Sequence, residues 1–158
     1  MLEFNFSPFP NLETNRLKLR RLHLLDGNEI LALRSNPEIM KFIPRPLIKT
    51  KEEDTLIGMI GFYRMKPENF RAEVGYILSA EFHGQGVITE ALERVIQFGF
   101  EEMKLNSIEA VIDPENFGSE KVLLKNNFVK EGHFKEHAFF EGKFLDSVFY
   151  SLLKKNFK

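Results

Sequence analysis

The chain has 158 residues, of which 43% are hydrophobic and 28% are charged, and its formal net charge is −1. This length fits one compact domain over residues 1–158 with a full hydrophobic core. The near-neutral charge gives no net attraction to nucleic acid or to anionic membrane, so neither is expected as a partner. No Cys is present, which excludes disulfides and thiolate metal sites and fits the cytoplasm.

The N-terminal residues lack a positive patch followed by an apolar run, so no secretory signal is expected. No apolar stretch is long enough to cross a bilayer. The four His residues are scattered, and only His133 and His137 are four residues apart, in a segment that does not read as a helix. We therefore expect no metal.

The first third of the chain predicts short elements. Residues 1–13 read as an irregular arm, and the alternation in Arg16–Arg20 predicts a half-buried strand. Asp26 is expected to cap a helix that runs to Arg34 with Ile30, Leu31 and Leu33 as its apolar side. A second short helix is predicted over Pro37–Phe42.

The middle third predicts a core. Thr55–Tyr63 is apolar on both faces, which is typical of a central strand, and Arg71–Ser79 reads as the next strand. A glycine turn then precedes a strongly amphipathic helix. The apolar positions of this helix are Ile88, Ala91, Leu92, Val95, Ile96, Gly99, Phe100 and Met103.

The last third predicts a strand over Ser107–Ile112, a helix over Phe117–Lys125 and two final strands over Phe128–Phe134 and Phe144–Leu152. Asn116 is the expected N-cap of that helix, and the pair Asn126-Asn127 offers a left-handed stop. The element order indicates a three-layer α/β (α+β) fold with one strand-helix-strand crossover.

The tripeptide Gly84-Gln85-Gly86 lies at the start of the amphipathic helix. Two glycines let the backbone approach a ligand, and the first N–H groups of a helix have no partner within the helix. With the helix dipole behind them, they form an anion site suited to a pyrophosphate, to which Thr89 could add a hydroxyl. The alternative is a plain strand-to-helix turn in which the glycines serve only tight geometry.

Three stretches together resemble a known family: AEVGYILSAEFHGQGVITEAL, DPENFGSEKVLLKNNFVKEG and FFEGKFLDSVFYSLL. They are similar to the GNAT superfamily of N-acetyltransferases, in the branch of the ribosomal-protein-alanine N-acetyltransferases. The resemblance runs from about Leu12 to Leu153. It implies a GNAT-like α-β-α sandwich with a mixed, mostly antiparallel sheet, and acetyl-CoA as cosubstrate.

The resemblance also implies a cofactor site. The family's pyrophosphate loop matches Glu81 to Gly86, but its leading Arg or Gln is Glu81 here, so the backbone N–H groups are expected to grip the phosphates. The pantetheine arm would pair with the strand before the turn, and the family's Asn-x-x-Ser pattern would face the thiol end. The implied cofactor-binding residues are Ile77, Leu78, Ser79, Gly84, Gln85, Gly86, Val87, Ile88, Thr89, Asn116 and Ser119.

The reaction needs an acid for the leaving thiolate and a base for the amine. Ser119 is the expected donor to the thiolate, and Glu73 is the expected base, directly or through water. The alternative for Glu73 is a solvated edge carboxylate or an ion-pair partner of Arg71. Some family members carry a loop carboxylate where Ala138 stands here, and the neighbouring His137 could substitute for it as a base.

One segment departs from the family. Between Ile43 and Thr55, family members usually carry a helix and a strand of two or three dozen residues, whereas here only Leu47–Asp54 connects the two sides. The loss would leave Thr55–Tyr63 without one neighbouring strand. Either the protein has a true deletion, or the sequence as it stands omits residues of the natural chain.

Two functions of different classes are open. The first is transfer of an acetyl group from acetyl-CoA to a primary amine, on a protein N-terminus or a small molecule. The second is a catalytically idle acyl-CoA-binding regulatory module on the same fold. The sequence does not select the amine. Aromatic pairs such as Phe139-Phe140 and Phe149-Tyr150 would suit a homodimer contact as well as a core.

Overall fold

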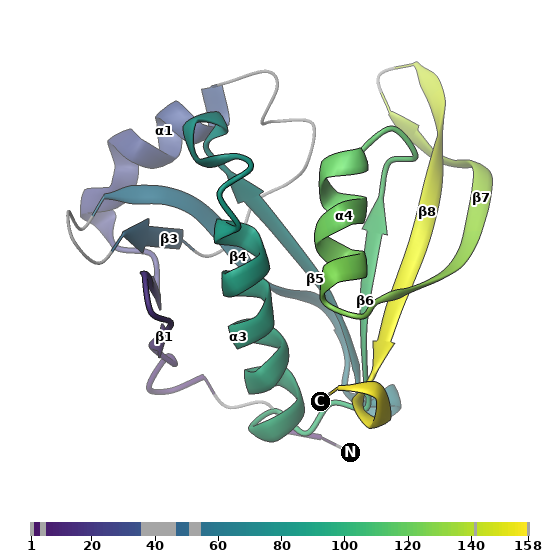
Figure 1. Cartoon of the computed structure of the whole chain (residues 1–158), viewed down its shortest axis with the longest axis horizontal. Helices are drawn as coiled ribbons and strands as arrows, with labels where there is room; N and C mark the ends of the chain where they lie inside the picture. Colours follow the sequence, from purple (N-terminus) through teal and green to yellow (C-terminus); the bar gives the residue numbers. More distant parts are fainter. Residues whose placement is uncertain (1, 4–5, 36–46, 51–54, 141, 158) are drawn as a thin grey trace. The chain divides into compact units, whose positions relative to one another are not determined.

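The computed structural model describes residues 2–3, 6–35, 47–50, 55–140 and 142–157 (Figure 1). The chain divides into two compact units. The N-terminal unit comprises Glu3–Gly61 and Gly75–Phe98, and the C-terminal unit comprises Met1–Leu2, Phe62–Val74 and Gly99–Lys158. Strands β4 (Leu56–Lys66) and β5 (Arg71–Leu78) and helix α3 (Val87–Glu101) each have residues in both units.

Antiparallel pairing joins β1, β2, β3 and β4 in chain order in the N-terminal unit. Single-turn 3-10 helices, η1 to η4, mark the element boundaries. The remaining elements are β1 (Leu12–Glu13), β2 (Leu17–Arg20), η1 (Leu24–Asp26), α1 (Gly27–Ser35), β3 (Leu47–Thr50), η2 (Pro67–Asn69), η3 (Ala80–Phe82), β6 (Ser107–Ile112), α4 (Phe117–Lys125), β7 (Val129–Phe140), β8 (Lys143–Leu153) and η4 (Lys154–Asn156).

Strand β3 corrects one expectation about the short connection. The prediction that Thr55–Tyr63 lacks a neighbouring strand is wrong, because Leu47 and Ile48 pair with Met59 and Gly58 of β4. The backbone N–H and C=O groups of β4 therefore have hydrogen-bond partners in β3, a segment that the sequence predicts to be only a connecting loop. The predicted helix over Pro37–Phe42 lies outside the described residues.

Helix α1 contributes to the core of the N-terminal unit. Leu33 is buried with Leu56, Met59 and Ile77, and Ile30 packs against this cluster. Leu31 is 65% exposed, so its expected place on the apolar side of the helix is wrong.

Asp26 directly precedes α1, as expected of a residue that caps this helix, and its carboxylate belongs to a hydrogen-bond network before the helix. Its carboxylate accepts hydrogen bonds from the guanidinium of Arg20, at 2.9 and 2.6 Å, and from the backbone N–H of His23 at 2.6 Å. Asp26 thus closes the capping box of η1, whose N-cap is His23.

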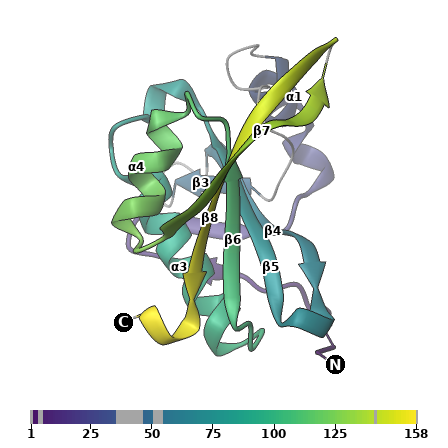
Figure 2. The ribbon, with the colours of Figure 1, turned by 90° about the vertical axis from the view of Figure 1, so that its right-hand side faces the viewer.

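In the C-terminal unit, β5 runs parallel to β6, β6 pairs antiparallel with β8, and β8 pairs antiparallel with β7. The parallel pair is joined through α3, which is the predicted strand-helix-strand crossover. Figures 1 and 2 show α4 covering one face of the β6–β8 pair. The predicted α/β class with a mixed, mostly antiparallel sheet is confirmed.

Strand β7 is longer than predicted. The expected strand ends at Phe134, whereas β7 continues to Phe140 and forms a hairpin with β8 that extends past the end of β6 (Figure 2). The pairing register shifts between Phe134 and Ala138, and Glu136 has a φ of 50°. A bulge adds residues that break the alternation of the strand, which hides it from pattern reading.

Most of the remaining predicted elements hold. The apolar residues of α3 are buried as the stripe predicts, α4 begins after Asn116, and Asn127 has the left-handed φ of 62° that ends it. No helix in the described part of the chain is long and apolar enough to cross a membrane.

Candidate functional site

The glycine turn before α3 has the backbone geometry that an anion site needs. Gly84 and Gly86 have φ values of +74° and +75°, a region that other residues rarely adopt. The first hydrogen bond of α3 runs from the N–H of Glu90 to the carbonyl of Gly86, at 3.1 Å. The N–H groups just before Glu90 therefore have no acceptor within the helix. Val87 and Ile88 are buried, and they can contribute to such a site only through their backbone.

Side chains fasten this turn to the strand before it. The Gln85 amide donates to the carbonyl of Glu81 at 2.9 Å, and Nε2 of His83 donates to the carbonyl of Leu78 at 3.1 Å. These bonds close the loop that leads from β5 to α3. Sequence reasoning gave no role to His83, because the bond depends on how the loop folds back.

The end of β5 has backbone free of β6. The register of β5 with β6 ends at the pair Glu73–Glu109, before Ile77 and Leu78. On the other side, the N–H of Ser79 donates to the carbonyl of Ile57 in β4 at 2.8 Å. Among the described pairings, none joins Ile77–Ser79 to β6, and the expectation that a pantetheine arm pairs with this segment stays a prediction.

Arg16 lies against the glycine turn, although it is far away in sequence. Its Nη1 and Nη2 each donate to the carbonyl of Gln85 at 3.3 Å, and its Nε donates to Glu90 at 2.6 Å. Glu90 also accepts bonds from the N–H of Arg16, at 3.0 Å, and from the hydroxyl of Thr14. Burial raises the pKa of Glu90, but the hydrogen bonds from Thr14 and Arg16 outweigh it, so the pKa is lowered overall.

The Asn-x-x-Ser pattern begins α4 in the C-terminal unit. The side-chain oxygen of Asn116 accepts the N–H of Ser119 at 3.0 Å, and its carbonyl accepts the N–H of Glu120 at 3.0 Å. The expected role of Asn116 as an N-cap is therefore confirmed. This cap fixes Ser119 in the first turn of the helix.

Glu73 is 5% exposed, so the alternative of a solvated edge carboxylate is wrong. Its partners are the hydroxyl of Tyr63, which donates to Oε1, and Arg64, which donates to Oε2 at 3.2 Å. Arg71 instead pairs with Glu109 at 2.8 Å, so the alternative of an Arg71–Glu73 ion pair is wrong too. Tyr63 and Arg64 were missed because strand alternation does not say which side chains meet.

Tyr150 reaches α4 from the core of the C-terminal unit. It is 2% exposed, and its hydroxyl donates to Oε1 of Glu120 at 2.6 Å. Burial, followed by the hydrogen bond to Glu120, raises the pKa of Tyr150 to about 12. Tyr150 is a core residue, so the pair Phe149-Tyr150 is not a fully exposed contact surface. Both residues of the other pair, Phe139-Phe140, are exposed. A homodimer remains a prediction.

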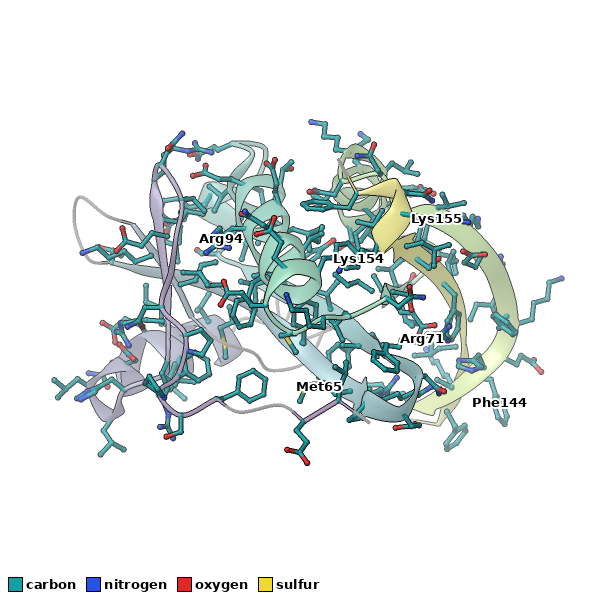
Figure 3. All side chains as sticks on the ribbon, turned by 90° about the horizontal axis from the view of Figure 1, so that it is seen from below. Met65, Arg71, Arg94, Phe144, Lys154 and Lys155 are labelled. Carbon is teal, nitrogen blue, oxygen red and sulfur yellow. The ribbon has the colours of Figure 1, made fainter. Side chains whose placement is uncertain are left out.

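The loop expected around Ala138 is part of strand β7. His137 packs its ring against Phe134 and Phe149, at centroid distances of 5.6 and 5.2 Å, and Ala138 pairs with Leu145. A base role for His137 therefore stays a prediction. The exposed Phe144 ring points outward from the hairpin (Figure 3).

The same hairpin holds a polar group centred on Asp146. Nε2 of His133 donates to Asp146 at 2.7 Å, and the N–H of Glu136 donates to the other Asp146 oxygen at 2.8 Å. The Glu136 N–H, followed by His133, lowers the pKa of Asp146. No group of three His, Asp or Glu side chains able to hold a metal occurs among the residues that the structure describes.

The expected site residues divide between the two units. The N-terminal unit brings together the phosphate turn and the end of the strand before it, and the C-terminal unit holds the expected catalytic pair and the N-cap. The first set is Ile77, Leu78, Ser79, Gly84, Gln85, Gly86, Val87, Ile88 and Thr89, and the second is Glu73, Asn116 and Ser119.

Comparison with known proteins gives a consistent family. Residues 47–129 match the model of the acetyltransferase (GNAT) domain. The chain is 33% identical over 173 aligned residues to an uncharacterized N-acetyltransferase, p20, of Bacillus licheniformis, covering 92% of this chain and 97% of that protein. It is 35% identical over 100 residues to the ribosomal-protein-serine acetyltransferase of Escherichia coli strain K12, covering 63% of this chain and 56% of that protein.

A solved structure supports the same assignment. The acetyltransferase (GNAT family) from Bacillus anthracis superposes with a TM-score of 0.87 at 25% identity, covering 92% of this chain and 99% of that one. The predicted GNAT-like fold is therefore confirmed.

Proposed function

Because the chain belongs to the GNAT acetyltransferase family, we propose that this enzyme transfers the acetyl group of acetyl-CoA to a primary amine. The observation that carries the proposal is the pair of positive-φ glycines, Gly84 and Gly86, directly before α3. The acceptor class is a protein N-terminal α-amine or a small-molecule amine. The likeness to a ribosomal-protein-serine acetyltransferase favours the protein N-terminus.

The residues of the turn fit the diphosphate of acetyl-CoA. The backbone N–H groups of Gly84, Gln85, Gly86, Val87, Ile88 and Thr89 would hold it, with the dipole of α3 behind them. Two features of the structure support this: the left-handed glycines, and the open space around Gly84, where no heavy atom of the described residues beyond its two chain neighbours lies within 4 Å of a Cβ placed on it. The pantetheine arm would pair with Ile77–Ser79.

The chemistry asks little of the protein beyond positioning and proton transfer. Acetyl-CoA supplies the acetyl group as a thioester, whose carbonyl carbon is the electrophile. Glu73 accepts a proton from the amine, directly or through a water, as the C–N bond forms. The sulfur would leave as a thiolate that accepts a hydrogen bond from the Ser119 hydroxyl as the C–S bond breaks. The thiolate then takes a proton from solvent, to which Glu73 returns the proton of the amine, so the products are an amide and the free thiol.

Each catalytic assignment has a structural basis within its own unit. Tyr63 and Arg64 hold the carboxylate of Glu73 in one position, and Asn116 holds the N–H of Ser119. A carboxylate held in one position is what a proton acceptor needs to act on a reacting atom, and a capped first turn fixes the backbone that carries the Ser119 hydroxyl. His137 is the alternative base.

The proposal is tested by release of the CoA thiol across a panel of amines that contains peptides with free N-termini, polyamines and amino acids. Turnover on at least one amine class is expected. Acetyl-CoA binding without turnover on every amine would instead favour the idle acyl-CoA-binding module. Failure to bind acetyl-CoA would overturn both functions.

We also propose that residues 1–158 are one acetyltransferase domain that lacks a segment of the family fold between Ile43 and Thr55, near residues 47–54. The alignment with the p20 protein spans 173 residues, more than the 158 residues of this chain, so the relative has positions that this chain lacks. Strand β3 is nevertheless present, so the missing residues are not the ones that form the strand beside β4. An intact mass of 18.5 kDa would establish a true deletion, and a larger mass would show omitted residues.

A further inference from the structure

The glycine turn has no cationic side chain of its own. The chain contains no Lys or Arg between Arg71 and Arg94, and Glu81 stands where the family's loop begins with Arg or Gln. A diphosphate would therefore meet backbone dipoles and polar side chains such as Thr89 from this segment, but no Lys or Arg. Among the described residues of the N-terminal unit, Arg16 brings its guanidinium to the turn, where it bonds the carbonyl of Gln85.

Arg16 contacts the turn at one particular peptide. Both of its Nη atoms donate to the carbonyl of Gln85, and Nη2 lies 3.8 Å from the Cβ position of Gly86. In a trans peptide the carbonyl and the N–H point in opposite directions. The N–H of Gly86 therefore faces away from Arg16, to the side on which an anion can be bound.

This contact acts on the N–H through the peptide itself. A cationic donor on the carbonyl polarises the peptide and strengthens its N–H as a donor. It also fixes a peptide that lies beside two glycines, Gly84 and Gly86, whose wide conformational freedom would otherwise let it rotate.

Glu90 joins Arg16 to the helix that follows the turn. Its carboxylate accepts Nε and the backbone N–H of Arg16 together with the hydroxyl of Thr14, while its own N–H bonds the carbonyl of Gly86. The β1–β2 connection, the turn and the first turn of α3 are thereby linked through two side chains.

We propose that Arg16 is a positioning residue for the phosphate turn, which orients the Gln85–Gly86 peptide and so sets the affinity for the diphosphate of acetyl-CoA. This inference rests on the proposed function. The family's loop begins with Arg or Gln, which Glu81 replaces here. In this chain Arg16, from the β1–β2 connection, would support diphosphate binding instead, by holding the Gln85–Gly86 peptide rather than by touching the ligand.

The test compares two acetyl donors in Arg16→Ala: acetyl-CoA, and S-acetylpantetheine, which lacks the diphosphate. We expect kcat/KM for acetyl-CoA to fall roughly tenfold, as for loss of a charged hydrogen bond, with kcat at saturation little changed. The kcat/KM for S-acetylpantetheine is expected to stay constant. Arg21→Ala, which removes an exposed guanidinium in the same unit, is the matched control and is expected to match the wild type.

Arg16→Lys separates geometry from charge, because Lys keeps the cation but cannot bridge Gln85 and Glu90 with a planar fork. Partial rescue at most is expected. Three results would each overturn the inference. They are wild-type kcat/KM for acetyl-CoA in Arg16→Lys, an unchanged acetyl-CoA affinity in Arg16→Ala, and an equal fall in kcat/KM for acetyl-CoA and S-acetylpantetheine in Arg16→Ala. Wild-type protein that binds no acetyl-CoA would instead overturn the proposed function, so the two failures are distinguishable.

Discussion

The hydroxyl of Tyr150 in β8 donates a hydrogen bond to Glu120 in the first turn of α4, at 2.6 Å. Tyr150 is almost fully buried, and Glu120 directly follows Ser119, the expected donor to the leaving sulfur. The bond therefore ties the turn that carries Ser119 to the core of the C-terminal unit.

This bond predicts a loss of stability at alkaline pH. An unfolded tyrosine titrates near pH 10, whereas the pKa of Tyr150 in the folded protein is about 12. The unfolded chain therefore releases the proton first, and the contribution of Tyr150, complete below pH 10, is lost as the pH rises through 12. Urea unfolding of wild type and Tyr150→Phe measures it.

We expect the wild type to be more stable than Tyr150→Phe by about 1 kcal/mol at pH 8. The difference is expected to shrink above pH 10. A difference that stays constant up to pH 11.5 would contradict the assigned pKa.

Gly84→Val is expected to abolish acetyl-CoA binding while the fold persists. In the described part of the chain, no heavy atom beyond the two chain neighbours of Gly84 lies within 4 Å of a Cβ placed there. The expected cost to folding therefore comes from its φ of +74° and amounts to about 1–3 kcal/mol. Calorimetric titration with acetyl-CoA and thermal unfolding measure the two effects.

The matched control is Gly142→Val at the tip of the β7–β8 hairpin. Gly142 has a φ of +80°, so its backbone strain is comparable, and among the described residues no heavy atom beyond its chain neighbours lies within 4 Å of its Cβ position. We expect similar destabilisation with acetyl-CoA binding retained. Equal affinities in both variants would refute the phosphate turn.

Ser119→Ala is expected to lower kcat roughly 10- to 100-fold while the dissociation constant of acetyl-CoA changes little, because the hydroxyl acts on the sulfur as the bond breaks. Steady-state kinetics and direct binding measure the two quantities. Ser151→Ala, which removes a hydroxyl that donates to Glu131 in the same unit, is the control and is expected to keep full turnover. Equal losses of kcat and affinity would make Ser119 a binding residue only.

Glu73→Gln is expected to lower kcat by at least about 100-fold, since the amide keeps the shape of the side chain but cannot accept the proton of the amine. Glu109→Gln serves as the control, because Glu109 is also an ion-paired carboxylate of the C-terminal unit. Comparable rates for both variants would transfer the base role to another residue, and His137→Asn would then be measured.

Gly58→Ala tests the packing of β4 against β5. A Cβ on Gly58 would lie 2.5 Å from the carbonyl oxygen of Ile77 and 3.2 Å from the Cα of Leu78, and backbone atoms cannot yield as a side chain can. We expect the free energy of unfolding to fall by about 1–3 kcal/mol.

Gly27→Ala is the control for this substitution. Gly27 has a helical φ of −59°, and no heavy atom of another element in the described ranges lies within 4 Å of its Cβ position. Ala should therefore be neutral or stabilise by up to about 1 kcal/mol. Chemical unfolding of both variants tests the pair, and similar changes would contradict the packing argument.

The sequence by itself determined the local features of this protein. The stripe of α3, the glycine turn and the cap at Asn116 depend on residues within one or two helical turns of each other, and their spacing is visible in the chain. The same is true of the family motifs, which are contiguous. These features were enough to predict the fold class and the acetyltransferase family.

Only the tertiary structure decided which distant side chains meet. Arg16 reaches Gln85 across 69 residues, Tyr63 rather than Arg71 bonds Glu73, and Leu47–Thr50 fills the place beside β4. Such contacts depend on strand register and on how loops fold back, which no periodicity of 2.0 or 3.6 records. The glycine turn itself was predicted from the sequence, but the arginine that supports it was not.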